Sequence, residues 1–193
     1  MKTDVISVSS SGARMAEALQ QIEKAAAYKG LTGKNALHLR LMTEEMMGLM
    51  RSITGETEGE FWMEDSKGIY ELHLRVENTM GAYQRQQLIN ASSSGKNEAP
   101  RGLMGRIRAF FEPSDDASFA GLILPGSSPQ AYSSFTWTME DYRDQLRERG
   151  KNDTGLQDAW DEMEKSVIAH VADNVKVSIH GDSAELILIK CMA

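Results

Sequence analysis

Residues 60–76 read EFWMEDSKGIYELHLRV, and a β-hairpin can be recognised in them directly. Residues 60–63 suit a first strand, and residues 66–68 have the composition of a tight turn. In the partner strand, residues 69–76, apolar side chains at the even positions alternate with more polar ones. That alternation is typical of a strand with one buried face. We therefore expect a hairpin that packs one side against helices.

Two helical segments precede the hairpin. Apolar residues recur at helical spacing between residues 15 and 26, after a short strand at residues 4–9. The serines at positions 9–11 are expected to cap this first helix by accepting hydrogen bonds from its free N–H groups. A second helix is expected from about residue 34 to residue 53, with Met42 and Met46 on its apolar face.

The remainder of the chain again mixes helices and strands. The expected elements are helices at about residues 79–90, 102–111, 139–149 and 156–171, and strands at residues 135–138, 175–179 and 184–189. Between them, residues 92–100 have the composition of a loop, and residues 113–134 are rich in Ser, Gly, Pro and Asp. The strands pair as hairpins or near neighbours, which favours an α+β fold. We expect a two-layer α/β sandwich with a mixed, mostly antiparallel sheet and its helices on one face.

Composition narrows the function classes. The chain of 193 residues carries a net charge of −7 with a pI of about 5.2. An acidic chain argues against nucleic-acid binding and against docking on an anionic membrane. A single cysteine cannot form an internal disulfide, and a signal peptide is not apparent at the N-terminus, so a cytoplasmic location is expected. The twelve methionines indicate either an adaptable core or an adaptable binding surface.

The sequence departs from several common catalytic motifs at specific residues. The stretches around Lys34 and Lys96 resemble a Walker phosphate loop, but asparagine follows each lysine where the motif needs a hydroxyl. The four histidines lack the spacing of a zinc-protease helix, and we interpret each as a surface or strand-face residue. The sequence has no G-x-S-x-G elbow that would indicate a Ser-His-Asp triad.

The second helix carries the first of three motifs, in residues 43–51, which read TEEMMGLMR. Their pattern resembles the GHKL, or Bergerat-fold, superfamily of histidine kinase-like ATPases, and in particular the anti-sigma-factor serine kinases. That family has a glutamate, an asparagine four residues later and often a basic residue three beyond. Glu44 and Arg51 match the ends of the motif, and Gly48 stands at the asparagine position. The resemblance implies that Glu44 is the catalytic residue and that Arg51 binds the phosphates of the nucleotide, while Gly48 offers no magnesium ligand. The alternative is an ordinary amphipathic helix with an acidic turn.

The second and third motifs follow the hairpin. The family has Asp-x-Gly after this strand to bind adenine, and here Glu77 or Asn78 is the substitute acceptor. Residues 94–107 resemble the family's flexible lid and glycine-rich helix start, with Lys96, Arg101, Gly102 and Gly105 as phosphate-binding residues. A helix N-terminus with glycines lets a phosphate approach the backbone N–H groups. The alternative for residues 75–81 is a strand end followed by a helix cap. The alternative for residues 94–107 is a solvated loop followed by a helix start.

The resemblance implies a single Bergerat-like domain over residues 1–193, with an insertion at residues 113–152. The leading hypothesis is a degenerate ATP-binding regulatory domain with weak or absent catalysis. ATP is the implied cofactor, and tight magnesium binding is not expected. A protein partner is expected, and a homodimer is compatible with this role. The competing hypothesis is a non-catalytic protein-interaction module on the same fold, and a third is an unrelated small-molecule enzyme.

Overall fold

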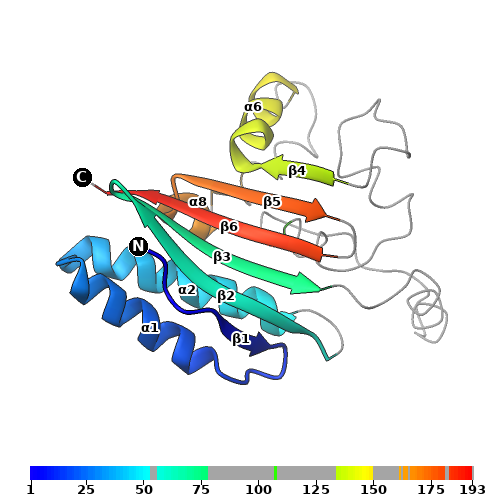
Figure 1. Cartoon of the computed structure of the whole chain (residues 1–193). Coiled ribbons are helices and arrows are strands. Elements are labelled where there is room, and N and C mark those ends of the chain that lie inside the picture. Colours follow the sequence, from blue (N-terminus) through cyan, green and yellow to red (C-terminus); the bar gives the residue numbers. More distant parts are fainter. Residues whose placement is uncertain are drawn as a thin grey trace.

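The computed structural model describes residues 1–52, 56–77, 107, 134–149, 161, 163, 164, 166–180 and 183–192. In chain order, its elements are β1 (Ile6–Ser9), α1 (Met15–Tyr28), α2 (Gly33–Ser52), β2 (Glu58–Ser66), β3 (Ile69–Glu77), β4 (Ser134–Thr138), α6 (Met139–Arg149), α8 (Val167–Val171), β5 (Asn174–His180) and β6 (Ser183–Cys191). Figure 1 shows the strands as one twisted sheet, with α1, α2 and α8 packed together on one side of it.

The six strands form one open sheet in the order β1-β2-β3-β6-β5-β4. Two hairpins, β2–β3 and β5–β6, meet at the centre of the sheet, where β3 pairs with β6. The β2–β3 turn has positive φ at Lys67 (52°) and at Gly68 (83°), the signature of a tight hairpin turn that suits the twist of the strands. All five pairings are antiparallel. The prediction of a mixed sheet allowed for parallel pairs, and the described strands form none.

All described helices lie on one face of the sheet. α1 contacts β1 and β2, α2 contacts β3 and α8, and α6 contacts β4 and β5. The buried row Phe61, Leu74, Leu186 and Val177 runs across four strands in register, and it continues to Trp137 at the edge. Trp137 meets Tyr142 of α6 with ring centroids 5.8 Å apart, so α6 shares the face used by the other helices. The predicted α+β fold, with helices on one face of a mostly antiparallel sheet, is confirmed.

The region predicted as an insertion contributes to this sheet. β4 and α6 both fall within residues 113–152, and β4 forms an edge strand paired with β5. Thr138 begins α6 by accepting a hydrogen bond at Oγ1 from the Asp141 N–H. The edge of the sheet next to β5 is therefore built from a segment that the family resemblance assigns to an insertion, and the strand and helix predicted at residues 135–138 and 139–149 form it.

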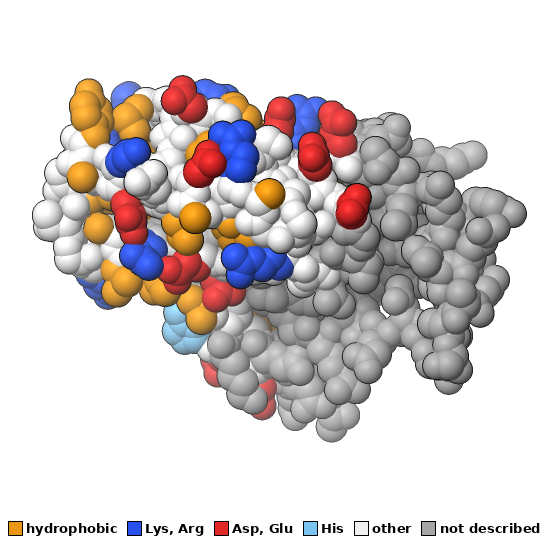
Figure 2. All heavy atoms as spheres, turned by 90° about the horizontal axis from the view of Figure 1, so that it is seen from below, with side chains coloured by type: hydrophobic (Ala, Val, Ile, Leu, Met, Phe, Trp, Pro, Cys, Tyr) orange, Lys and Arg blue, Asp and Glu red, His pale blue; other side chains and the backbone are white. Residues whose placement is uncertain are grey.

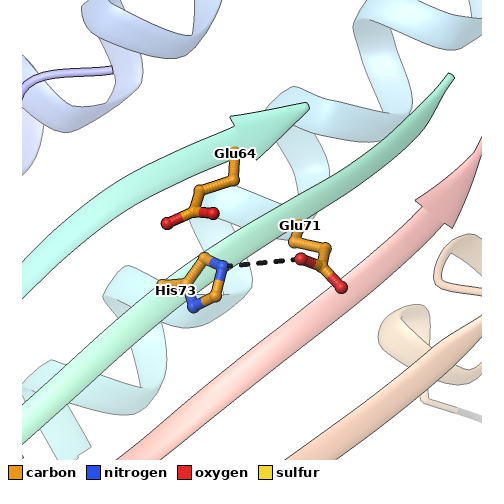
Figure 3. A group of neighbouring side chains, drawn as sticks. All are labelled: Glu64, Glu71 and His73. Atoms are coloured by element: carbon orange, nitrogen blue, oxygen red, sulfur yellow. Dashed lines mark ion pairs between the residues drawn. The ribbon is translucent and has the colours of Figure 1, made fainter. Parts of the chain in front are cut away.

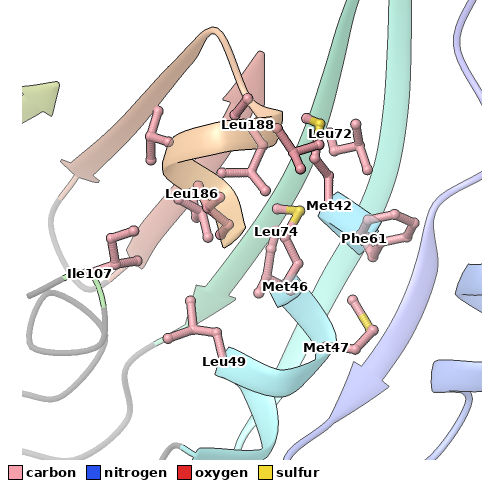
Figure 4. Close-up of a cluster of buried hydrophobic side chains, with 14 of the residues drawn as sticks. Met42, Met46, Met47, Leu49, Phe61, Leu72, Leu74, Ile107, Leu186 and Leu188 are labelled. Atoms are coloured by element: carbon pink, nitrogen blue, oxygen red, sulfur yellow. The ribbon is translucent and has the colours of Figure 1, made fainter. Parts of the chain in front are cut away.

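The core lies between the sheet and the helices, and methionines fill much of it. Figure 4 shows α2 side chains directed at β3 and β6. The buried methionines are Met15, Met42, Met46, Met47, Met50, Met63, Met139, Met163 and Met192. Of the two interpretations of the methionine content, the described residues therefore support an adaptable core, because Met1 is their single exposed methionine.

The outer surface of the helices is of mixed charge, with hydrophobic side chains scattered over it. Viewed from below, it shows Lys and Arg side chains interspersed with Asp and Glu side chains (Figure 2). Ion pairs account for part of this pattern, such as Arg14 with Glu17 at 2.8 Å. None of the described helices combines the length and the apolar composition that crossing a bilayer requires.

Candidate functional site

The acidic turn of α2 lies on the surface of the helix layer. Its neighbours Met42, Met46 and Met50 are fully buried against the sheet, which directs the opposite side of the helix outward. Gly48 is exposed on that outer side, and a side chain added at its position would meet no atom within 4 Å. The position that the resemblance assigns to asparagine is therefore uncovered, and its backbone accommodates any residue.

Glu44 lies on the flank of α2 that faces α1. Its Oε1 accepts a hydrogen bond from Arg40 Nε at 2.9 Å, and this bond raises the pKa of Arg40. The same guanidinium reaches Glu23 of α1, with Nη1 2.6 Å from Oε1. Arg40 thus bridges two carboxylates from two helices, and the charge of Glu44 is partly neutralised.

Arg51 lies on the same flank, near the start of α1. Its Nε is 3.0 Å from Met15 Sδ and 3.7 Å from the Cβ that a side chain at Gly12 would have. Among the described residues it forms no ion pair, and the residue is exposed. Glu44 and Arg51 are thus brought to one side of α2, as their spacing predicts, with Arg51 as an available cation.

Glu45 is the carboxylate that sequence reasoning passed over. One residue beyond Glu44, it points about 100° around the helix, toward the flank on which Leu49 is buried. Burial raises the pKa of the Glu45 carboxyl, and the neighbouring Glu44 carboxylate adds to that rise. A signal was available in the sequence, because Leu41, Glu45 and Leu49 recur at four-residue spacing on a single stripe.

The glycine-bearing segment is represented by one described residue, Ile107. Its side chain is fully buried in the same core cluster as Leu49 of α2 and Leu186 of β6 (Figure 4). Ile107, two residues after Gly105, therefore belongs to the core that α2 helps to cover. The other predicted site residues, Asn78, Lys96, Arg101, Gly102 and Gly105, lie outside the described residues.

A comparison with models of known protein families, with curated proteins and with solved structures found no match. The resemblance to the Bergerat-fold ATPases therefore rests on the residues of this chain alone. The prediction that Glu44 acts as the catalytic base stays a prediction.

Proposed function

We propose that this chain is a degenerate GHKL-type regulatory domain that binds ATP weakly and has lost efficient phosphoryl transfer. The observation that carries the proposal is the turn of α2 around the exposed Gly48. There Glu44, Glu45 and Arg51 are each three or four residues from Gly48, so they are its neighbours on the helix surface. An uncovered glycine is thus bordered by two carboxylates and a cation.

The described residues fit the nucleotide better than they fit the metal. The Arg51 guanidinium is exposed and can bind a phosphate through charge-assisted hydrogen bonds. Magnesium prefers oxygen ligands in near-octahedral geometry. Gly48 supplies none, and Arg40 already occupies Glu44 Oε1. Because phosphoryl transfer depends on metal ions to neutralise developing charge, we expect catalysis to be weak or absent.

Replacement of Gly48 tests the proposal directly. Gly48→Asn supplies the amide that the family carries at this position, and Gly48→Ala is the matched control that removes glycine without adding a ligand. Both should fold, because nothing lies within 4 Å and alanine is favoured over glycine in a helix by about 0.5–1 kcal/mol. In isothermal titration with ATP and magnesium, we expect Gly48→Asn to bind about tenfold more tightly than Gly48→Ala, a difference of about 1.4 kcal/mol. If the wild type and both variants show neither heat of binding nor a thermal shift at millimolar ATP, the chain does not bind the nucleotide.

A second candidate is the protein-interaction module, and the sheet itself favours it. No described helix packs on the sheet face opposite the helices, here called the second face, and Thr136 and Ser178 lie there on adjacent strands. We also propose a cytoplasmic location, because Cys191 is a free, exposed thiol and a reducing compartment keeps such thiols unpaired. A pull-down from cytosol with wild type and a Thr136→Lys/Ser178→Lys variant distinguishes this candidate. Partners lost from the double variant support it, and unchanged partners argue against the second face as the contact.

A further inference from the structure

Three side chains that can bind a metal ion converge on the second face of the sheet. They are Glu64 of β2 and Glu71 and His73 of β3, and one ligand atom from each lies within 4.8 Å of the others (Figure 3). The strand register explains the group. Glu64 pairs directly with Glu71, and His73 follows two residues later on the same face. The group is separated from the acidic turn of α2 by the sheet itself.

The hydrogen bond between His73 and Glu185 favours the tautomer that a metal requires. Its Nδ1 is 2.9 Å from Glu185 Oε1, and since a carboxylate can only accept, Nδ1–H is the donor. In the neutral ring, Nε2 then carries the lone pair. It is buried, with the residue 7% exposed, and it has no hydrogen-bond partner among the described residues. A carboxylate on the far nitrogen of a histidine is the usual outer partner of a metal-binding imidazole.

The unpartnered nitrogen points into the group. His73 Nε2 lies 3.9 Å from Glu71 Oε2, and Figure 3 shows the ring edge directed between the two glutamates. The ring cannot easily turn away, because it stacks on Trp62 with centroids 4.7 Å apart. A lone pair facing a carboxylate is unfavourable unless a proton, a water molecule or a metal cation lies between them, and a metal cation also satisfies both glutamates.

The carboxylates of Glu64 and Glu71 also require a positive charge nearby. Like charges directly opposite each other on neighbouring strands are destabilising. Lys2 offsets part of this repulsion, with Nζ 3.0 Å from Glu64 Oε1, and the Trp62 indole N–H donates to that same oxygen at 3.0 Å. Among the described residues, the one basic side chain within 4.0 Å of the Glu71 carboxylate is His73, at 3.9 Å. The side chains of Glu64 and Glu71 are 40% and 36% exposed, so an ion can reach them from solvent.

We propose that Glu64, Glu71 and His73 bind one divalent transition-metal cation, of which Zn²⁺ and Mn²⁺ are the representatives to test. His73 Nε2 and one oxygen of each carboxylate are the ligands, and water completes the shell. A nitrogen ligand beside two carboxylates favours these cations over Mg²⁺ and Ca²⁺, which prefer oxygen-only sites. Zinc bonds of about 2.0–2.2 Å require the carboxylates to draw closer, which their exposed side chains allow.

The test is a titration of the whole chain with ZnCl₂, and separately with MnCl₂ and MgCl₂, after removal of bound metal by a chelator. All proteins carry Cys191→Ser, which excludes binding by the exposed thiol. We expect one zinc site that Glu71→Gln weakens at least about tenfold. Glu60→Gln is the matched control on the same face of β2, and His170→Asn tests adventitious binding by an exposed histidine. Both should leave the affinity within about twofold.

Stability without metal gives a second, independent measure. Glu71→Gln removes a like-charge pair, so the metal-free variant should melt at a higher temperature than its parent while it loses zinc binding. The proposal is wrong if metal-free Glu71→Gln melts at a lower temperature than its parent and the parent binds no zinc. In that case His73 is an imidazolium held between Glu71 and Glu185. Equal zinc affinity in Glu71→Gln and its parent would likewise overturn the proposal.

Discussion

The imidazole of His73 lies flat against the indole of Trp62, with ring centroids 4.7 Å apart and planes 8° from parallel. The two residues are direct cross-strand neighbours on β2 and β3. Both are largely buried, at 7% and 9% exposure. The pair therefore anchors the second face at the centre of the longest hairpin.

A double-mutant cycle should detect this stacking. With Trp62→Leu, His73→Leu and the double variant, measured by urea unfolding with a chelator present, we expect a coupling of about 0.5–1.5 kcal/mol. A control cycle pairs Trp62→Leu with Val177→Ala, three strands away at about 14 Å. The control energies should add to within about 0.5 kcal/mol. Additive energies for Trp62 and His73 would show that the stacking contributes nothing of its own.

Glu45→Gln should stabilise the protein at neutral pH. Burial raises the pKa of the Glu45 carboxyl, so the folded chain binds its proton more tightly than the unfolded chain does. Stability is therefore lost as pH rises above the ordinary value of 4.5. A neutral amide avoids this loss. Thermal melts should show a higher melting temperature for Glu45→Gln at pH 7 and little difference at about pH 4. An equal gain at both pH values would contradict the electrostatic origin.

Asp65→Asn should destabilise the protein with the opposite pH dependence. The Asp65 side chain is 5% exposed, and its Oδ2 lies 2.5 Å from Lys29 Nζ. The hydrogen bond from Lys29 lowers the pKa of Asp65, so its contribution is present above the ordinary value of 3.8 and is lost as pH falls through the lowered one. We expect a loss of about 1–3 kcal/mol at pH 7, measured by urea unfolding, that shrinks in acid. Asp4→Asn, at an exposed carboxylate, is the control and should change little.

Gly68→Ala should be the most damaging glycine substitution among the described residues. The φ of Gly68 is 83°, and a Cβ at this position would approach the Met192 carbonyl oxygen to 2.5 Å. The two residues are held together because the Met192 N–H donates a hydrogen bond to the Gly68 carbonyl oxygen. Gly30 has φ 69° with no atom within 4 Å, so Gly30→Ala isolates the cost of the backbone conformation. That cost is about 1–2 kcal/mol, and Gly68→Ala should exceed it. Equal losses in denaturant melts would show that the turn shifts to relieve the contact.

Most of the fold could be predicted because local periodicity specifies it. The helix expected over residues 34–53 is α2 at Gly33–Ser52, since its apolar stripe is continuous. Capping of α1 by serines was wrong. The residue before α1 is Arg14 at φ 58°, without a side-chain cap, and Ser10 Oγ instead accepts from Thr57 N. The hydrogen bond between Ser10 and Thr57 joins residues 47 positions apart, and it replaces the local capping bond. Local propensity carries no information about such a distant partner.

The sites were harder to predict than the elements. The stripe of Leu41, Glu45 and Leu49 indicates that Glu45 borders the core, but the link from Glu44 through Arg40 to α1 depends on how the two helices pack, which the sequence pattern does not encode. The group around His73 depends on strand register, because Glu64 and Glu71 meet only when β2 and β3 pair in register. Glu185, which orients the ring, lies 112 positions along the chain. Each histidine could be expected at the surface or on a strand face, but its neighbours could not be predicted.

The central β3–β6 pairing also has a consequence for synthesis. β3 is complete by residue 77, yet the strand that covers its free edge begins at residue 183. On a ribosome, the N-terminal helices and the β2–β3 hairpin emerge first and must wait with an unpaired edge that can recruit a neighbouring nascent chain. Folding of the whole sheet is therefore expected to be slow and to depend on early protection of β3.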